Sequence, residues 1–220
     1  MAALALHRRV SFEGLEDVTG LFVGRGAPVH GDRADTVSPF LPPGVEAAYL
    51  EQVHSATVLD ARPGANGRGD ALVTRRRGLA LAVVTADCVP VLLADDERVG
   101  AVHAGWRGLV AGIVGKALER FDPATTRAWI GPAISGRVYE VGDDVASRLA
   151  AVGGPDVLRD GPRGRACADL QRVARRQIAS AGVAEIRVLE LCTLGEPELL
   201  HSYRRDGAAA GRNWSLVWRA

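Results

Sequence analysis

The stretch that decides the fold spans residues 85–108 and reads TADCVPVLLADDERVGAVHAGWRG. Within it, turn residues at 95–98 separate an apolar run at 89–94 from a second run at 99–102, and a third apolar run precedes them at 79–85. Short runs rich in Val and Leu between turn residues are typical of strands buried on both faces. The stretch therefore predicts three neighbouring buried strands.

Soft or borderline metal ligands stand at the ends of such runs. Cys88 follows the run at 79–85, His103 follows the run at 99–102, and His54 follows an apolar run at 47–53. Two imidazoles and one thiolate are a ligand set of catalytic zinc, with a fourth position open for water or substrate. The alternative is a core cysteine with two hydrogen-bonded histidines. A metal site follows only if the three segments meet in the fold.

A second chemistry uses the same residues without a metal. Cys88 beside a histidine is the arrangement of a cysteine nucleophile activated by a base. Asp87 could orient that histidine, act as a general base, or only cap a turn. A zinc enzyme loses activity to chelators, whereas a thiol nucleophile is alkylated whether or not a chelator is present.

Candidate anion-binding residues are arginines. The segment 103–108, HAGWRG, predicts a strand-to-helix turn whose free N–H groups could bind an anion beside Arg107. The alternative is a tight turn that needs glycine, with Trp106 as packing. Arg25 follows a predicted strand, and Arg204 and Arg205 lie together near the C-terminus. If that segment is a strand, only one of the two adjacent arginines reaches a given site. Each could instead be a solvated surface residue.

The rest of the pattern mixes strands and helices. It predicts further strands at 20–25, 47–53, 56–59, 70–74, 127–130, 186–191 and 214–218, and helices at 109–121, 143–152 and 167–181. Loops or turns are expected at 26–43, 63–69 and 153–164. No linker or repeat divides the chain. We expect an α/β (α+β) fold over 1–220, one domain with a mixed β-sheet core flanked by helices.

Composition narrows the function classes. The chain has 220 residues, is 47% hydrophobic and carries a net charge of +1, which disfavours nucleic acid or an anionic membrane as partner. Three widely spaced cysteines form no disulfide framework and favour a reducing compartment. The first nine residues, MAALALHRR, put basic residues after an apolar run, the reverse of a signal peptide. We expect a cytoplasmic protein, and leave monomer or homodimer open.

Together these segments resemble the YfiH-like, or laccase-domain, family, once labelled multicopper polyphenol oxidoreductase. The matching pieces are QVH at 52–54, DALVT at 70–74, TADC at 85–88, HAGWRG at 103–108, IGPAI at 130–134, YEV at 139–141, CT at 192–193 and SYRR at 202–205. They stand in the family's order and cover nearly the whole chain.

The resemblance implies a single α/β domain with zinc held by His54, Cys88 and His103. It also implies purine nucleoside chemistry: phosphorolysis of adenosine, inosine, guanosine or methylthioadenosine, and deamination of adenosine. On this interpretation Asp87, Cys88 and His103 are the catalytic residues, and Arg25, Arg107, Arg204 and Arg205 are the candidates to bind phosphate. The partners are small molecules, purine nucleosides and phosphate. Some relatives are linked to editing of peptidoglycan precursors.

Two alternatives stay open beside that interpretation. One is a metal-free cysteine hydrolase or amidase with Cys88 as nucleophile, and the other is a non-enzymatic protein with a structural zinc. A structural site would want a fourth protein ligand, which Cys192 or His201 could supply. Copper is less expected than zinc, since a blue-copper centre plus a trinuclear cluster needs many imidazoles and the chain has five histidines.

Overall fold

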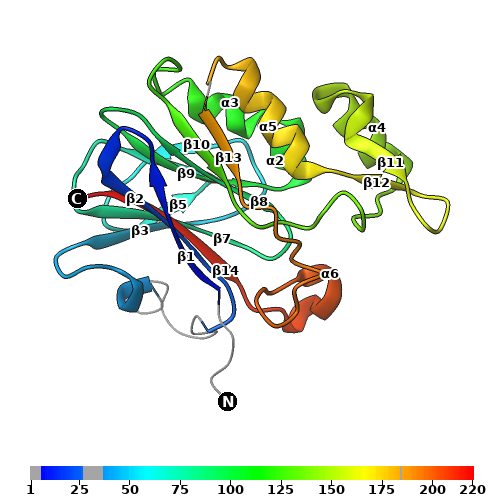
Figure 1. The fold of residues 1–220 in the computed structure, drawn as a ribbon, viewed down its shortest axis with the longest axis horizontal. Coiled ribbons are helices and arrows are strands. Elements are labelled where there is room, and N and C mark those ends of the chain that lie inside the picture. The colour runs from blue at the N-terminus through cyan, green and yellow to red at the C-terminus, as the bar shows by residue number, and fades with distance from the viewer. Residues whose placement is uncertain (1–5, 27–36, 184) are drawn as a thin grey trace.

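Two six-stranded sheets form the centre of the computed structural model, which describes residues 6–26, 37–183 and 185–220 (Figure 1). In spatial order the first sheet contains β1 (His7–Phe12), β2 (Leu15–Val23), β14 (Asn213–Arg219), β7 (Leu79–Thr85), β3 (Glu46–Glu51) and β5 (Gly64–Arg68). The second contains β13 (Glu185–Val188), β10 (Arg127–Ile130), β8 (Val89–Ala94), β9 (Val99–Ala104), β6 (Ala71–Thr74) and β4 (Val58–Asp60). Both sheets mix parallel and antiparallel pairs.

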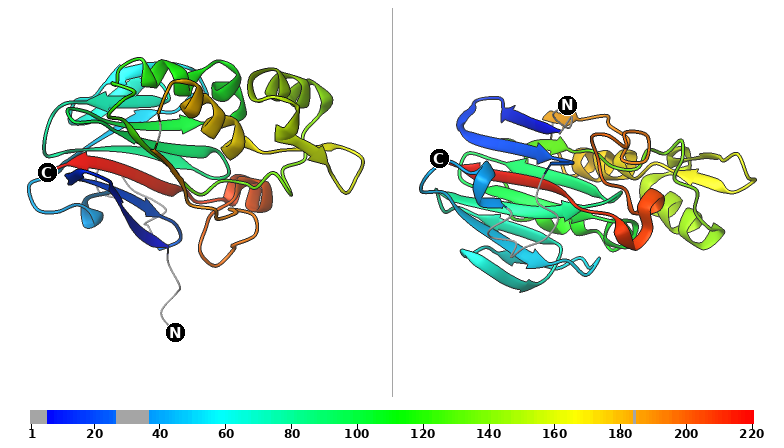
Figure 2. Two further views of the ribbon diagram at one scale, coloured as in Figure 1. Left: turned by 45° about the horizontal axis from the view of Figure 1, so that its top comes forward. Right: turned by 90° about the horizontal axis from the view of Figure 1, so that it is seen from below.

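Helices form a third layer outside the second sheet (Figures 1 and 2). The helices are α2 (Trp106–Val110), α3 (Ile113–Leu118), α4 (Asp143–Gly153) and α5 (Leu170–Ser180), with α4 packed on α2 and α5. The remaining elements are η1 (Ser38–Phe40), η2 (Pro155–Val157), the hairpin β11 (Leu158–Asp160) and β12 (Ala166–Ala168), α6 (Tyr203–Asp206) and η3 (Gly207–Ala209).

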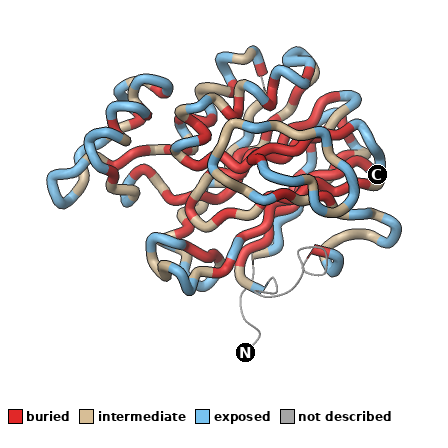
Figure 3. The backbone as a smooth tube through the Cα atoms, turned by 180° about the vertical axis from the view of Figure 1, so that it is seen from behind, coloured by how far each residue is buried: buried red, intermediate tan, exposed pale blue. Residues whose placement is uncertain are grey.

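The layers explain why the central strands are apolar throughout. One core cluster fills the space between the two sheets, and a second fills the space between the second sheet and the helices. Every residue of β8 and β9 is buried, because these strands have side chains in both clusters. Figure 3 shows the buried backbone concentrated in the centre of the molecule. A third cluster, with Trp214 and Trp218, covers the outer face of the first sheet.

The predicted fold class is confirmed, and so are several strand bounds. The runs at 79–85, 89–94 and 127–130 are strands with the predicted limits. We expected one mixed sheet, whereas the structure has two. A long apolar run indicates a strand that is buried on both faces, but it does not tell whether helices or a second sheet cover each face. The second sheet therefore could not be predicted from these runs.

Other predicted elements were wrong in detail. The expected helix at 109–121 is divided into α2 and α3, because Gly112 between them has a left-handed φ of 79°. The expected turn at 63–69 contains β5, which pairs in parallel with β3 and is held by the Asn66 side chain donating to the Tyr49 carbonyl. Glycine-rich sequence gave no sign of this strand.

Three further differences concern segment limits. The strand expected at 20–25 is the end of β2, which begins at Leu15 and pairs with β1. The segment around Arg204 is helix α6 and not a strand, since the Ser202 side chain caps its start by accepting from the Arg205 amide. The loop expected at 153–164 contains η2 and β11. Most of the loop expected at 26–43 lies outside the described residues, and η1 lies in its described part.

In residues 6–26, 37–183 and 185–220, no helix is long and apolar enough to span a membrane.

Leu92 offers a test of the packing between the sheets. It lies in β8, is 0% exposed and belongs to the cluster between the sheets. We expect Leu92→Ala to lower the free energy of unfolding by about 2–5 kcal/mol, since it removes buried methyl groups and leaves a cavity. Urea unfolding followed by circular dichroism measures this. Val138→Ala is the control, because Val138 is 39% exposed and its truncation should change stability by about 0.5 kcal/mol or less. Equal unfolding midpoints for the two variants would contradict the packing described.

Candidate metal centre and its cavity

The three predicted ligands meet at one end of the two sheets. His54 lies just after β3, Cys88 lies in the turn between β7 and β8, and His103 lies near the end of β9. Their ligand atoms all lie within 4.8 Å of one another, with His54 Nε2 3.8 Å from Cys88 Sγ. The two imidazole rings meet edge to face, with centroids 4.8 Å apart. The expected convergence of the three segments is therefore confirmed.

Asp70 orients two of the three candidate ligands through hydrogen bonds. Its carboxylate is 0% exposed, and Oδ1 lies 2.7 Å from His103 Nδ1. With Nδ1–H donating to Asp70, the other nitrogen of the His103 ring is left as a ligand. The same carboxylate accepts from the backbone N–H of His54 at 3.0 Å and from the Ser55 N–H at 2.6 Å. One buried charge therefore positions two of the three ligands.

Asp70 is a site residue that the sequence analysis missed. Its only signal was an acidic residue at the start of a predicted buried strand. His54 reaches its position with a left-handed φ of 58°, which a non-glycine residue adopts at an energetic cost. The hydrogen bonds to Asp70 hold this turn in place.

The charges of the group are strongly coupled in the metal-free protein. Burial opposes ionisation of the Cys88 thiol, but hydrogen bonds with His103 and His54 outweigh it and lower the thiol pKa to about 6. Burial also disfavours a charged His103, but Asp70 and Cys88 outweigh it and raise the His103 pKa to about 9. Asp70 is buried as well, yet its bonds to His103 and Ser55 lower its pKa to about 2. Both shifts favour the charged forms, a thiolate on Cys88 and an imidazolium on His103.

A glycine lets the helix layer approach the ligands. A Cβ on Gly105 would lie 2.8 Å from His54 Cδ2 and 3.0 Å from Cys88 Sγ. Gly105 has an ordinary φ of −73°, so space and not backbone conformation requires glycine here. The predicted strand-to-helix turn is confirmed, with Gly105 as the N-cap of α2. His103 lies within β9 and not after it.

Asp87 joins the ligand turn to the C-terminal part of the chain. It has a φ of 98°, a strained value for a non-glycine residue. Its Oδ1 accepts from the Thr193 hydroxyl and its Oδ2 from the Arg204 backbone N–H, both at 2.6 Å. Both oxygens of Asp87 therefore already accept hydrogen bonds from the protein.

A cavity of about 540 Å³ opens over the three ligands. Besides the ligands it is lined by Gln52, Val84, Thr85, Ala86, Asp87, Trp106, Arg107, Tyr139, Tyr203, Arg204 and Arg212. Arg107 lies over the Trp106 ring at 4.5 Å, and Arg204 over the Tyr139 ring at 4.9 Å. Arg212 was missed, because nothing in the sequence distinguishes it from a surface arginine. The wall thus combines aromatic faces with positive charge.

The structure places Arg25 and Arg205 outside this lining. Arg25 lies 3.4 Å from the Asp206 carboxylate. The Arg205 guanidinium donates to the carbonyls of Thr193 and Leu200 and to Asp206. Of the four predicted anion-binding arginines, Arg107 and Arg204 reach the cavity, while Arg25 and Arg205 hold the segment around α6.

Neither Cys192 nor His201 joins the ligand group. Cys192 Sγ accepts from the Ser135 N–H, and the His201 ring packs against Gly211, where a Cβ would lie 2.5 Å from His201 Cε1. Among the described residues, His, Cys, Asp and Glu side chains supply three ligands and no fourth. The donor set of two imidazoles and a thiolate fits a divalent metal with an open position, as in catalytic zinc sites.

Comparisons with known proteins identify the family of the chain. The family model described as multi-copper polyphenol oxidoreductase laccase matches residues 27–220. A Deinococcus radiodurans protein named purine nucleoside phosphorylase is 38% identical over 198 residues, covering 86% of this chain and 77% of that protein. The Escherichia coli purine nucleoside phosphorylase YfiH is 40% identical over 177 residues, covering 77% of this chain and 72% of its own.

Solved structures share the fold. A crystal structure of a hypothetical protein YfiH from Bacillus licheniformis superposes with a TM-score of 0.86 at 25% identity, covering 97% of this chain and 99% of that one. A Neisseria meningitidis protein superposes with a TM-score of 0.85 at 30% identity, covering 97% of this chain and 98% of the other.

The thiolate gives a direct test of the site's electrostatics. In metal-free protein we expect iodoacetamide to alkylate Cys88 with a rate that rises around pH 6, where an ordinary cysteine is still almost entirely thiol. Mass spectrometry of the modified peptides measures the rate at each pH. Cys167 is the internal control, because it is buried and its pKa is raised by that burial. A midpoint for Cys88 above about pH 8, the range of a free thiol, would contradict the pairing with His103 and His54.

Proposed function

The chain belongs to the multi-copper polyphenol oxidoreductase laccase family, and on that premise we propose that it is a zinc-dependent purine nucleoside phosphorylase. The observation that carries the proposal is the His54–Cys88–His103 group, which has room for one more ligand and lies in the cavity wall. Relatives named purine nucleoside phosphorylase align with most of the chain and supply the reaction class.

Zinc is proposed over copper despite the family's description. An open site of two histidines and one cysteine is the ligand set of a catalytic zinc. The chain's five histidines are too few for the several copper centres of a laccase. When bound, the ion would supply a Lewis acid to the cavity that His54, Cys88 and His103 line.

The proposed reaction joins phosphate to the sugar and releases the base. A phosphate oxygen forms a bond to C1′ while the bond from C1′ to N9 breaks, and the purine leaves with that electron pair and gains a proton. The products are the free base and a sugar 1-phosphate. We propose adenosine, inosine, guanosine and methylthioadenosine as substrates. A cavity of about 540 Å³ lies within the range of small-molecule sites.

The cavity residues divide into two proposed roles. Trp106, Tyr139 and Tyr203 offer aromatic faces against which a purine could stack. Arg107 and Arg204 offer guanidinium groups suited to a phosphate. The backbone amides at the start of α2 could add donors beside Arg107. Arg25 and Arg205 would act indirectly, since they hold the helix that bears Arg204.

Asp87 is proposed as a positioning residue as well as a candidate for proton transfer. It lines the cavity, where a carboxylate could exchange a proton with the leaving base. The two hydrogen bonds it accepts hold the Thr193 hydroxyl and the backbone of Arg204 in place.

Deamination of adenosine is a second activity that the same cavity could support. It would add water at C6 of the purine and release ammonia, giving inosine. The candidate metal ligands and the cavity of about 540 Å³ beside them support it. We also propose a cytoplasmic location, because the Cys88 thiol must stay reduced to bind a metal.

One observation favours a second candidate function. Cys88 Sγ lies 3.8 Å from His54 Nε2, and hydrogen bonds with His103 and His54 lower the pKa of the thiol, as in an activated cysteine nucleophile. A metal-free hydrolase or amidase acting on a peptidoglycan precursor would use that pair. A purely structural zinc is less well supported, because the described residues supply no fourth ligand.

The first test measures base release by purified protein from adenosine, inosine, guanosine and methylthioadenosine, with and without phosphate. We expect phosphate-dependent release of free base, and a loss of about 100-fold or more in His103→Ala together with its zinc, since ligand loss removes the ion. Chromatography separates nucleoside from base, and the adenosine reaction also reports inosine formed by deamination.

The controls separate the candidate functions. Arg75→Ala removes an exposed arginine that pairs with Glu97 and should leave the rate unchanged. A zinc-loaded wild type that leaves every nucleoside intact would refute the phosphorylase proposal. Activity that survives chelation but disappears on alkylation of Cys88 would favour the cysteine hydrolase.

The second test concerns Asp70. We expect Asp70→Asn to weaken zinc affinity by about 10- to 100-fold, because the amide no longer balances the charge of His103 or raises its basicity. Competition with a chromophoric chelator measures the affinity. Asp96→Asn is the matched control, since Asp96 lies exposed in the turn between β8 and β9. Equal affinities of the two variants, with folding verified by circular dichroism, would show that Asp70 does not support the metal site.

A further inference from the structure

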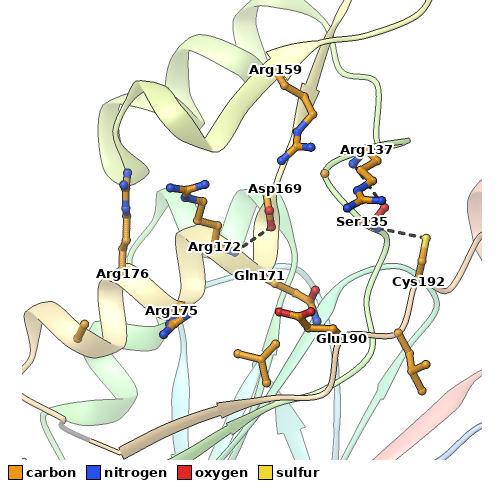
Figure 4. A pocket seen from close by; sticks show the side chains of 14 residues that line it. Ser135, Arg137, Arg159, Asp169, Gln171, Arg172, Arg175, Arg176, Glu190 and Cys192 are labelled. Atoms are coloured by element: carbon orange, nitrogen blue, oxygen red, sulfur yellow. Dashed lines mark hydrogen bonds between the residues drawn. The ribbon is translucent and has the colours of Figure 1, made fainter.

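A second cavity, larger than the one over His54, Cys88 and His103, lies beside α5. Its volume is about 860 Å³. Its wall comes from α5, from the segment after β10 that carries Ser135 and Arg137, from β11 with Arg159, and from the segment after β13 that carries Glu190 and Cys192 (Figure 4). None of the three metal ligands lines it. We call it the arginine pocket.

The lining is strongly positive in a chain that is nearly neutral. Five arginines border the pocket, against the carboxylates of Asp169 and Glu190, which leaves an excess of three positive charges. The whole chain has a net charge of only +1. The five arginines are Arg137, Arg159, Arg172, Arg175 and Arg176.

Only two of these guanidinium groups are paired with a carboxylate in the described parts of the chain, and they share the same one. Arg172 and Arg176 both pair with Asp156 from η2. Asp169 is occupied as the N-cap of α5, where it accepts from the Arg172 backbone N–H. Arg137, Arg159 and Arg175 make no side-chain ion pair or hydrogen bond within residues 6–26, 37–183 and 185–220.

The unpaired groups come from three different elements. Arg137 lies in the segment after β10, Arg159 in β11 and Arg175 in α5. Figure 4 shows Arg159 extending from its strand towards Asp169, with Arg137 on the neighbouring segment. Like charges that border one hollow repel each other, so an anion that meets several of them at once gains from all of them.

We propose that the arginine pocket binds an oligophosphate, either inorganic or the phosphate chain of a nucleotide. Guanidinium groups bind phosphate oxygens in a bidentate way, and a chain of phosphates presents such oxygens on every side. Val188 and Leu191 are apolar lining residues, and a nucleoside attached to the phosphate chain would lie against them. The pocket shares no lining residue with the cavity over the metal ligands. Adjacent residues of one segment contact both linings, since Cys192 lines the arginine pocket and Thr193 donates to Asp87 in the other cavity.

Calorimetric titration of the full chain with inorganic tripolyphosphate tests the proposal. We expect one bound tripolyphosphate per chain, with an affinity that falls as salt is added. Arg159→Ala should weaken it about ten-fold or more, the effect of one lost charged hydrogen bond, and Arg137→Ala/Arg159→Ala/Arg175→Ala should abolish it. Titration with ATP under the same conditions tells whether an attached nucleoside adds affinity.

Two further variants locate the bound ligand. Arg75→Ala removes one arginine that pairs with Glu97 near the turn between β8 and β9, and should bind as the wild type does. If the triple variant binds tripolyphosphate as tightly as the wild type, or if Arg204→Ala abolishes binding instead, the arginine pocket is not the site. Binding of single-stranded RNA with no binding of tripolyphosphate or ATP would refute the ligand class.

Discussion

The buried carboxylate of Asp70 is the interaction on which the candidate site depends. A charge that is wholly removed from water is stable only when hydrogen bonds replace its hydration. Asp70 meets that requirement with the His103 ring, the Ser55 hydroxyl and the backbone amides of the turn at His54. Satisfying this one charge therefore fixes the ligand turn after β3 and the ligand in β9 in the same step.

The layered fold supplies the rigidity around that charge. β8 and β9 are buried on both faces, with the first sheet on one side and the helices on the other. Strands packed on both sides cannot shift without disturbing two core clusters. Cys88 and His103 consequently have little conformational freedom. The cavity residues of α6, and Arg212 after it, lie in short and less buried segments.

The sequence was most informative where hydrophobic runs were long and undivided. The strands at 79–85 and 89–94 followed from such runs, and the ligands followed from polar residues at their ends. β5 could not be predicted, because a glycine-rich segment becomes a strand only through pairing with β3. Asp70 and Arg212 could not be assigned, since their roles depend on which distant segments lie beside them. The same holds for Arg25 and Arg205, whose partners are carboxylates and carbonyls that no spacing in the chain indicates.

The unequal exposure of the two histidines has a consequence for a bound metal ion. His103 is 3% exposed and fixed by Asp70, whereas His54 is exposed at the rim of the cavity. An ion held by this group would be accessible to solvent on the side of His54, whereas its His103 ligand would be shielded by the protein.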